Sequence, residues 1–141
     1  MKKLRHLVCG TDFSEGAEHG LELAIKLAFA TSARLTLVHV CEFGAAELDA
    51  ADLDATSLLE RREALSQALT RHRRSGIEMT GLLRSGRPWE KLDNVAADVG
   101  ASLIVIGRHG AGRGPSVEIG SVADRLVRCA SRPVLTVPSN L

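Results

Sequence analysis

Short apolar runs alternate with stretches of helical periodicity along the whole chain, and this alternation limits the possible folds more than any other feature. Strands are predicted at 4–9, 35–40, 77–84, 103–106 and 133–138. Helices are predicted between them, the first capped by Asp12 or Ser14 and the others at about 57–75, 88–99 and 121–131. Such alternation predicts a single α/β domain, with an open, mostly parallel five-stranded sheet and helices on both faces.

Two of the five strands have the pattern of sheet edges. The run at 77–84 alternates apolar and polar residues, which is typical of a half-exposed strand. The last strand is bracketed by Pro133 and Pro138, and proline is confined to edges and strand ends. The run 103–106 is apolar throughout, which indicates a strand covered on both faces.

Length, charge and cysteine content exclude several classes of protein. A chain of 141 residues fits one domain, and 18 basic against 17 acidic residues leave too weak a field for a nucleic-acid binder. No apolar run is long enough for a membrane span or resembles a signal core, so we expect a cytoplasmic protein without membrane insertion. Three widely spaced cysteines fit neither a disulfide framework nor a zinc site, and Cys9 and Cys129 are expected to be small core residues. The alanine-rich segment 42–56 has five acidic and no basic residues, and it is expected to be a mobile acidic loop or short helical insertion.

A glycine-rich segment links the predicted fourth strand to the last helix. It contains Gly107, two residues, Gly110, nine residues, and then Gly120 and Ser121. A strand that leads through such a loop into a helix start can direct backbone N–H groups and the positive end of a helix at a phosphate. Residues 10–12 and 40–41 follow two other parallel strands, whose carboxyl ends meet at one edge of the sheet. The sequence therefore predicts a site for a phosphate-bearing small molecule at that edge.

These features together resemble the universal stress protein family, over essentially the whole chain. The resemblance is carried by Thr11-Asp12-Phe13-Ser14, by Leu37-Val38-His39-Val40, and by the spacing Gly107-x2-Gly110-x9-Gly120-Ser121. That glycine spacing resembles the branch of the family that binds ATP. The resemblance also implies strand order 3-2-1-4-5 and a homodimer formed through the last strand, residues Val134, Leu135, Thr136 and Val137.

The resemblance implies a set of residues for ATP or another adenine nucleotide. Asp12, next to Thr11, is placed near the ribose and phosphates, directly or through Mg²⁺, and the backbone of Val40 meets the adenine. Ile106 and Gly107 border the ribose, and Gly110 borders the phosphates. Donors to the phosphate tail are expected from Gly120, Ser121 and Val122, with Arg108 as a counter-charge.

Several of these residues also have structural interpretations. Ser121 begins Ser-x-x-Asp, a capping box that would form without ligand, and Asp12 could simply cap the first helix. His109 is a candidate general base, but the sequence identifies no acid partner for it. His39 lies in an apolar strand, which favours a core histidine with satisfied hydrogen bonds, or one close to a dimer interface, over a metal ligand.

The leading functional hypothesis is an ATP-binding regulatory protein of the stress response, a homodimer whose behaviour depends on nucleotide occupancy. A slow ATPase or phosphoryl-transfer protein is one alternative. The chain lacks Gly-x4-Gly-Lys-Ser/Thr and an evident base for in-line attack, which argues against efficient turnover. A dimer that binds proteins and no nucleotide is the other alternative, and the glycines disfavour it.

Overall fold

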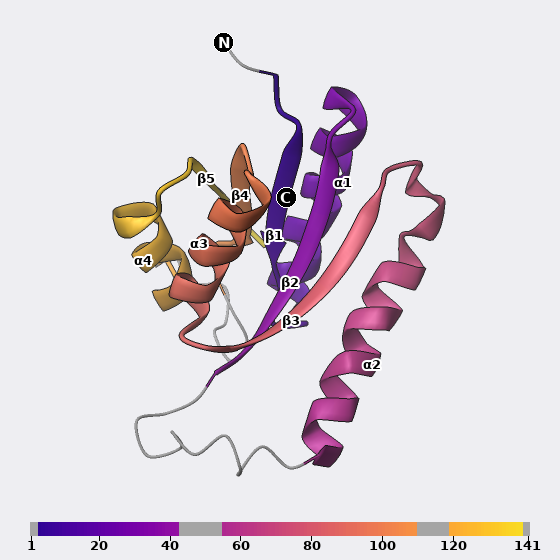
Figure 1. Cartoon of the computed structure of the whole chain (residues 1–141), viewed down its shortest axis with the longest axis vertical. Helices are drawn as coiled ribbons and strands as arrows, with labels where there is room; N and C mark the ends of the chain where they lie inside the picture. Colours follow the sequence, from indigo (N-terminus) through magenta and orange to yellow (C-terminus); the bar gives the residue numbers. More distant parts are fainter. Residues whose placement is uncertain (1–2, 43–54, 110–118, 140–141) are drawn as a thin grey trace.

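Five parallel strands form the centre of the molecule in the order β3-β2-β1-β4-β5 (Figure 1). The computed structural model describes residues 3–42, 55–109 and 119–139. Each of the four strand pairings is parallel. The strands are β1 (His6–Gly10), β2 (Arg34–Glu42), β3 (Met79–Gly86), β4 (Leu103–Gly107) and β5 (Val134–Val137). The predicted sheet, strand order and edge strands are therefore confirmed.

Within the described residues four helices connect the strands, and local sequence signals explain where they begin and end. They are α1 (Glu15–Thr31), α2 (Ala55–Arg71) with a short 3-10 turn η2 (Arg73–Ser75), α3 (Pro88–Val99) and α4 (Ser121–Cys129). Ser14, one of the two predicted caps, begins α1 because its Oγ accepts a hydrogen bond from the N–H of Ala17 at 3.2 Å. Pro88 occupies the first turn of α3, where its missing N–H costs nothing. Gly76 adopts a φ of 81° directly after η2, a conformation that favours glycine.

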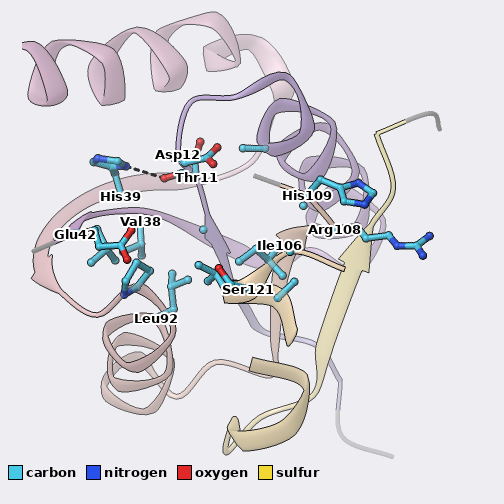
Figure 2. A pocket seen from close by; sticks show the side chains of 18 of the residues that line it. Thr11, Asp12, Val38, His39, Glu42, Leu92, Ile106, Arg108, His109 and Ser121 are labelled. Atoms are coloured by element: carbon cyan, nitrogen blue, oxygen red, sulfur yellow. Dashed lines mark hydrogen bonds between the residues drawn. The ribbon is translucent and has the colours of Figure 1, made fainter. Parts of the chain in front are cut away.

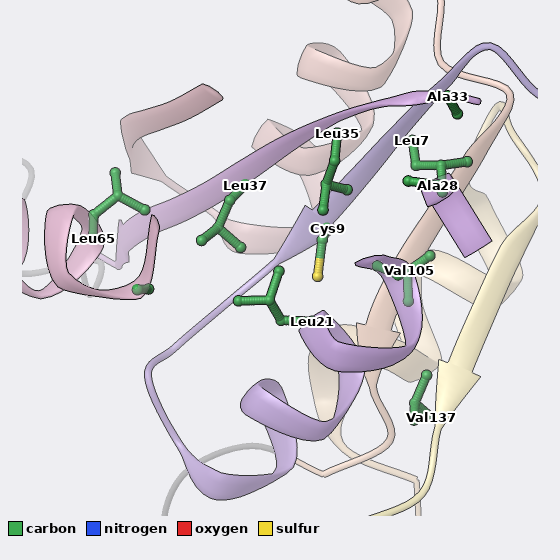
Figure 3. Close-up of a cluster of buried hydrophobic side chains, with 12 residues drawn as sticks. Leu7, Cys9, Leu21, Ala28, Ala33, Leu35, Leu37, Leu65, Val105 and Val137 are labelled. Atoms are coloured by element: carbon green, nitrogen blue, oxygen red, sulfur yellow. The ribbon is translucent and has the colours of Figure 1, made fainter. Parts of the chain in front are cut away.

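Helices cover both faces of the sheet because successive strand residues point to opposite sides. Leu7 and Cys9 of β1 pack with Leu21 of α1 and Leu65 of α2 in one cluster, shown in Figure 3. Val8, between them, belongs to the opposite cluster with residues of α3 and α4. Both clusters contain strand residues that are fully buried, so the central strands are held firmly and their carboxyl ends have fixed positions.

Two sequence predictions need correction. Cys129, expected in the core, is exposed, because it lies in the last turn of α4 and the helix ends before that turn returns to the sheet. The expected acidic insertion at 42–56 is too wide at both ends. Glu42 is the last residue of β2, and Ala55 and Thr56 begin α2. The rest of that segment, 43–54, lies outside the described residues.

Candidate functional site

A pocket of about 370 Å³ lies at the carboxyl ends of the strands. The chain winds from β1 outward to β2 and β3, then returns to place β4 on the other side of β1, so the pocket sits where the winding reverses. Ligands of open parallel sheets bind at this point. The volume falls within the range of small-molecule sites. Figure 2 shows His39, Glu42 and Leu92 toward one end of the pocket and Arg108 and His109 toward the other.

The loop after β1 is a tight turn held by its own side chains. The Oδ1 of Asp12 accepts a hydrogen bond from the N–H of Ser14 at 3.0 Å, and the Oγ1 of Thr11 accepts one from the N–H of Phe13 at 3.0 Å. Phe13 has a φ of 64°, a left-handed conformation that is rare for a bulky residue. The N–H of Thr11 donates to the carbonyl oxygen of Val38 at 2.9 Å, which ties the turn to β2. Asp12 therefore caps its own turn, and Ser14 is the residue that caps α1.

A backbone hydrogen bond joins the residue after β4 to the residue before α4. The N–H of Gly120 donates to the carbonyl oxygen of Arg108 at 2.7 Å. This contact places the start of α4 beside the end of β4. The N–H of Gly120 is thus already bonded in this structure, so the expectation that Gly120 donates to phosphates needs revision.

The predicted capping box at Ser121 is wrong. Gly120 is the N-cap of α4, and its carbonyl oxygen accepts from the N–H of Asp124 at 2.9 Å. Ser121 is the first helical residue and is exposed at the pocket. The first-turn N–H groups of Ser121, Val122 and Ala123 have no carbonyl partner within the helix, as in any helix start. All three residues line the pocket, so the positive end of α4 faces it.

His39 connects β2 to two neighbouring elements inside the pocket. Its Nε2 lies 2.7 Å from Nη1 of Arg61 on α2, and its Nδ1 lies 2.8 Å from the carbonyl oxygen of Thr11. The guanidinium only donates, so Nε2 must accept, and the proton on Nδ1 must be donated to Thr11. The ring of Phe13 lies 4.4 Å from the imidazole, measured between centroids. The expectation of a core histidine with satisfied hydrogen bonds is thus confirmed.

Burial is the main cause that lowers the pKa of His39, and the charge of Arg61 lowers this pKa further. The hydrogen bond to Thr11 and the nearby carboxylate of Asp12 act in the opposite direction and do not reverse the shift. The neutral ring that the hydrogen bonds require is therefore also the form that its surroundings favour.

His109 is 8% exposed and lines the pocket. Neither of its ring nitrogens has a hydrogen-bond partner within residues 3–42, 55–109 and 119–139. A general base needs an orienting partner, commonly a carboxylate, and none of the described residues provides one. The geometry therefore adds no support for a catalytic role of His109.

Nine of the ten residues that the sequence predicted for the nucleotide line one pocket, and the tenth is not among the described residues. The pocket is lined by Thr11, Asp12, Val40, Ile106, Gly107, Arg108, Gly120, Ser121 and Val122. Gly110 lies outside the described residues. Sequence reasoning missed further lining residues, among them Ala17, Val38, Arg61, Leu92 and Ala123. The sequence around Arg61 did not indicate a ligand-binding role, because arginines on a polar helix face are normally solvated.

The described residues include no group of three or more His, Cys, Asp or Glu side chains that could hold a metal ion by themselves. Within the same ranges, every helix is too short or too polar to span a bilayer. Any Mg²⁺ near Asp12 would therefore need oxygen ligands from the bound molecule, which is the usual way that Mg²⁺ binds with phosphates.

Comparison with known proteins places these features in one family. The model of the universal stress protein family matches residues 3–138. Universal stress protein MJ0577 of Methanocaldococcus jannaschii is 25% identical over 150 residues, covering 90% of both sequences. The solved structure of MJ0577 is similar with a TM-score of 0.84 at 22% identity, over 97% of both chains.

Two further solved structures are similar over nearly their whole length. A protein of the universal stress protein family from Burkholderia pseudomallei has 32% identity and a TM-score of 0.76, over 98% of both chains. The universal stress protein from Archaeoglobus fulgidus in complex with dAMP has 26% identity and a TM-score of 0.73, over 96% of this chain and 98% of that one.

Proposed function

The chain belongs to the universal stress protein family, and on that premise we propose that it is a regulatory protein that binds ATP or a related adenine nucleotide in the pocket described above. The observation that carries the proposal is the start of α4. Its first-turn N–H groups, at Ser121, Val122 and Ala123, have no carbonyl partner within the helix and lie at a pocket where the sheet winding reverses. Such a helix start attracts anionic oxygens.

The pocket offers different chemistry along its length. Phosphates belong at the start of α4, with Arg108 as a counter-charge and Gly110 as a further residue beside the phosphates. Gly120 has no side chain at this point, which leaves room for phosphate oxygens close to the helix. The ribose belongs beside Ile106, Gly107 and Asp12.

The adenine belongs at the opposite end, against the strand-end backbone of Val40. Val38 and Leu92 provide apolar surface there. Asp12 provides an exposed carboxylate that would complete the coordination of an Mg²⁺ ion carried by the phosphates. Thr11 fixes the turn that presents this carboxylate.

A relative supports the choice of an adenine nucleotide. The Archaeoglobus fulgidus protein, whose complex contains dAMP, has the same fold over 96% of this chain. The same pocket also indicates the length of the phosphate chain. A helix start with several N–H donors and a neighbouring arginine suits a longer phosphate tail better than a single phosphate.

The regulatory part of the proposal requires two states with different affinity for the nucleotide. We propose that these are states of a homodimer paired through β5, residues Val134, Leu135, Thr136 and Val137. β5 is an edge strand that pairs with β4 in the sheet, and β4 ends in Gly107 at the pocket. Nucleotide occupancy and pairing of the two chains would thus act on adjacent strands.

Thermal unfolding with and without millimolar ATP and Mg²⁺ tests nucleotide binding. A ligand at about 1,000 times its dissociation constant stabilises the folded state by about 4 kcal/mol, which raises the melting temperature by roughly 10–15 °C for a domain of this length. Mass spectrometry of small molecules that co-purify with the protein identifies the natural ligand. Absence of both a shift and a co-purified nucleotide would leave a protein-binding dimer as the better hypothesis. Phosphate release at many turnovers per minute would favour an enzyme instead.

A further inference from the structure

Arg61 is the only cation that α2 contributes to the described pocket lining. It lies in the second turn of α2, which starts near the carboxyl end of β2 (Figure 1). Arg61 is half-buried as a residue, and its guanidinium is held by the 2.7 Å contact with Nε2 of His39. Because His39 is also bonded to Thr11 and lies against Phe13, the arginine is fixed relative to the β1 turn and to β2.

The position of Arg61 separates it from the expected phosphate end. Its Nη1 contacts His39 at 2.7 Å, and Figure 2 shows His39 and Glu42 toward one end of the pocket, whereas Arg108 lies toward the other. Val38 and Leu92, which Figure 2 shows toward the same end of the pocket as His39, are apolar, and this suits a base better than a phosphate. The described part of the pocket has no Phe, Trp or Tyr lining residue against which a base could stack. A guanidinium is planar and stacks on aromatic faces, so it provides a substitute.

We propose that Arg61, oriented by His39, is a base-recognition residue of this pocket, whose guanidinium plane packs on the purine or contacts its edge. This inference rests on the proposed nucleotide binding and adds the residue that recognises the base. It assigns His39 a positioning role: its neutral ring accepts from Arg61 and donates to Thr11. An arginine kept in place before the ligand arrives loses less side-chain entropy on binding.

The test compares Arg61→Ala with Arg62→Ala. Arg62 is the adjacent arginine on the same helix, and its side chain is exposed outside the pocket lining. Both substitutions remove one positive charge from α2, so they change long-range attraction for an anionic ligand similarly. Calorimetry measures the dissociation constants for ATP and for inorganic tripolyphosphate, which has the phosphate chain without the base. Circular dichroism and thermal melts establish that the variants are folded.

We expect Arg61→Ala to weaken ATP binding roughly ten- to hundred-fold, the effect of removing a stacking partner of a base, and to leave tripolyphosphate binding unchanged. Arg62→Ala should change neither constant by more than about two-fold. Arg61→Lys keeps the charge without the plane, and it should recover less than half of the lost binding free energy.

Other outcomes overturn the inference in distinguishable ways. An equal loss of ATP and tripolyphosphate affinity would make Arg61 a phosphate ligand, and unchanged ATP affinity would make it a structural partner of His39. Both results leave nucleotide binding itself intact. Failure of the unmodified protein to bind any adenine nucleotide would overturn the proposed function and this inference together.

Discussion

The carbonyl oxygen of His109 lies directly against Gly16 of α1, where a Cβ atom would approach it to 2.7 Å. A second contact of the same kind joins these elements, since a Cβ on Gly107 would come within 2.8 Å of the carbonyl oxygen of Gly16. One turn further along α1, a Cβ on Gly20 would lie 3.2 Å from the backbone nitrogen of Gly107. The first two turns of α1 therefore pack backbone to backbone against Gly107 and His109, at the end of β4.

Gly16→Ala should consequently destabilise the protein and weaken nucleotide binding. A glycine-to-alanine substitution within a helix normally stabilises the protein by up to about 1 kcal/mol through helix propensity. A lower free energy of unfolding would therefore show that the contact with His109 outweighs this gain. We expect a loss of roughly 1–3 kcal/mol, typical of overpacking, because a backbone carbonyl cannot rotate away as a side chain can. Gly20→Ala, with more room, should be closer to neutral. Urea denaturation of both variants measures the difference, and a stabilised Gly16→Ala would show that the loop yields easily.

Ser121→Ala separates a structural from a ligand-binding role at the start of α4. Gly120 is the N-cap, so removal of the Ser121 hydroxyl should change the free energy of unfolding by less than about 0.5 kcal/mol. Loss of a capping side chain would instead cost about 1 kcal/mol. ATP affinity should fall several-fold if the hydroxyl reaches a phosphate. Denaturation and calorimetry on the same preparation measure both quantities, and reduced stability with unchanged affinity would contradict this assignment.

Gly120→Val tests the cradle at the phosphate end. The glycine is buried between the carbonyl of Arg108 and the first turn of α4, at a φ of −66° that valine also adopts. Backbone strain is therefore not expected, and the added methyl groups would occupy the space assigned to phosphate oxygens. We expect binding of both ATP and tripolyphosphate to fall below detection while the protein stays folded, in contrast to Arg61→Ala. Retained affinity would place the phosphates away from this helix start.

Sequence periodicity predicted the sheet and its edges, and the shared edge at which parallel strands end predicted where a ligand pocket would lie. The individual pocket residues came from the resemblance to the universal stress protein family. Sequence reasoning failed where the decisive contact joins distant segments. Gly16 is an ordinary helix residue until β4 is placed against it. Arg61 resembles any solvated helix arginine until the fold brings it to His39, 22 residues earlier, whose Nε2 accepts a hydrogen bond from it inside the pocket. His39 was the available signal, because a histidine in an apolar strand requires hydrogen-bond partners. Cys129 was misassigned because helical periodicity does not show where a helix leaves the core.

The pH dependence of stability should reveal the link between His39 and Arg61. Burial first, and the charge of Arg61 second, lower the pKa of His39 in the folded state, whereas the unfolded chain has the usual value of about 6.5. Between these values the unfolded state binds more protons, so stability rises with pH. The free energy of unfolding therefore includes the full contribution of neutral His39 above about pH 6.5. This contribution is lost as the pH falls from 6.5 toward the lowered pKa of the folded state.

Arg61→Ala should make that decline shallower than in the unmodified protein, because one cause of the lowered pKa is removed. His6, whose pKa is also lowered, chiefly by burial, contributes equally to both proteins and cancels in the comparison. Urea denaturation from pH 5 to 8 measures the two slopes, with Arg62→Ala as the matched control. Identical slopes for Arg61→Ala and the unmodified protein would show that the two side chains are not electrostatically coupled in solution.

The hydrogen-bond pattern of the edge strand β5 predicts which residues would pair in the proposed homodimer. The carbonyl oxygens of Pro133 and Val137 accept from the N–H groups of Ile104 and Arg108, so odd-numbered residues of this strand face β4. Val134 and Thr136 therefore direct their backbone groups to the free edge, where a second copy would pair. Thr136→Pro removes one outward N–H without removing a bond to β4, and it should shift the protein to monomer. Thr136→Val keeps the N–H and should remain dimeric. Sedimentation equilibrium distinguishes these states, and a Thr136→Pro variant that stays fully dimeric would show that the two chains pair through another surface.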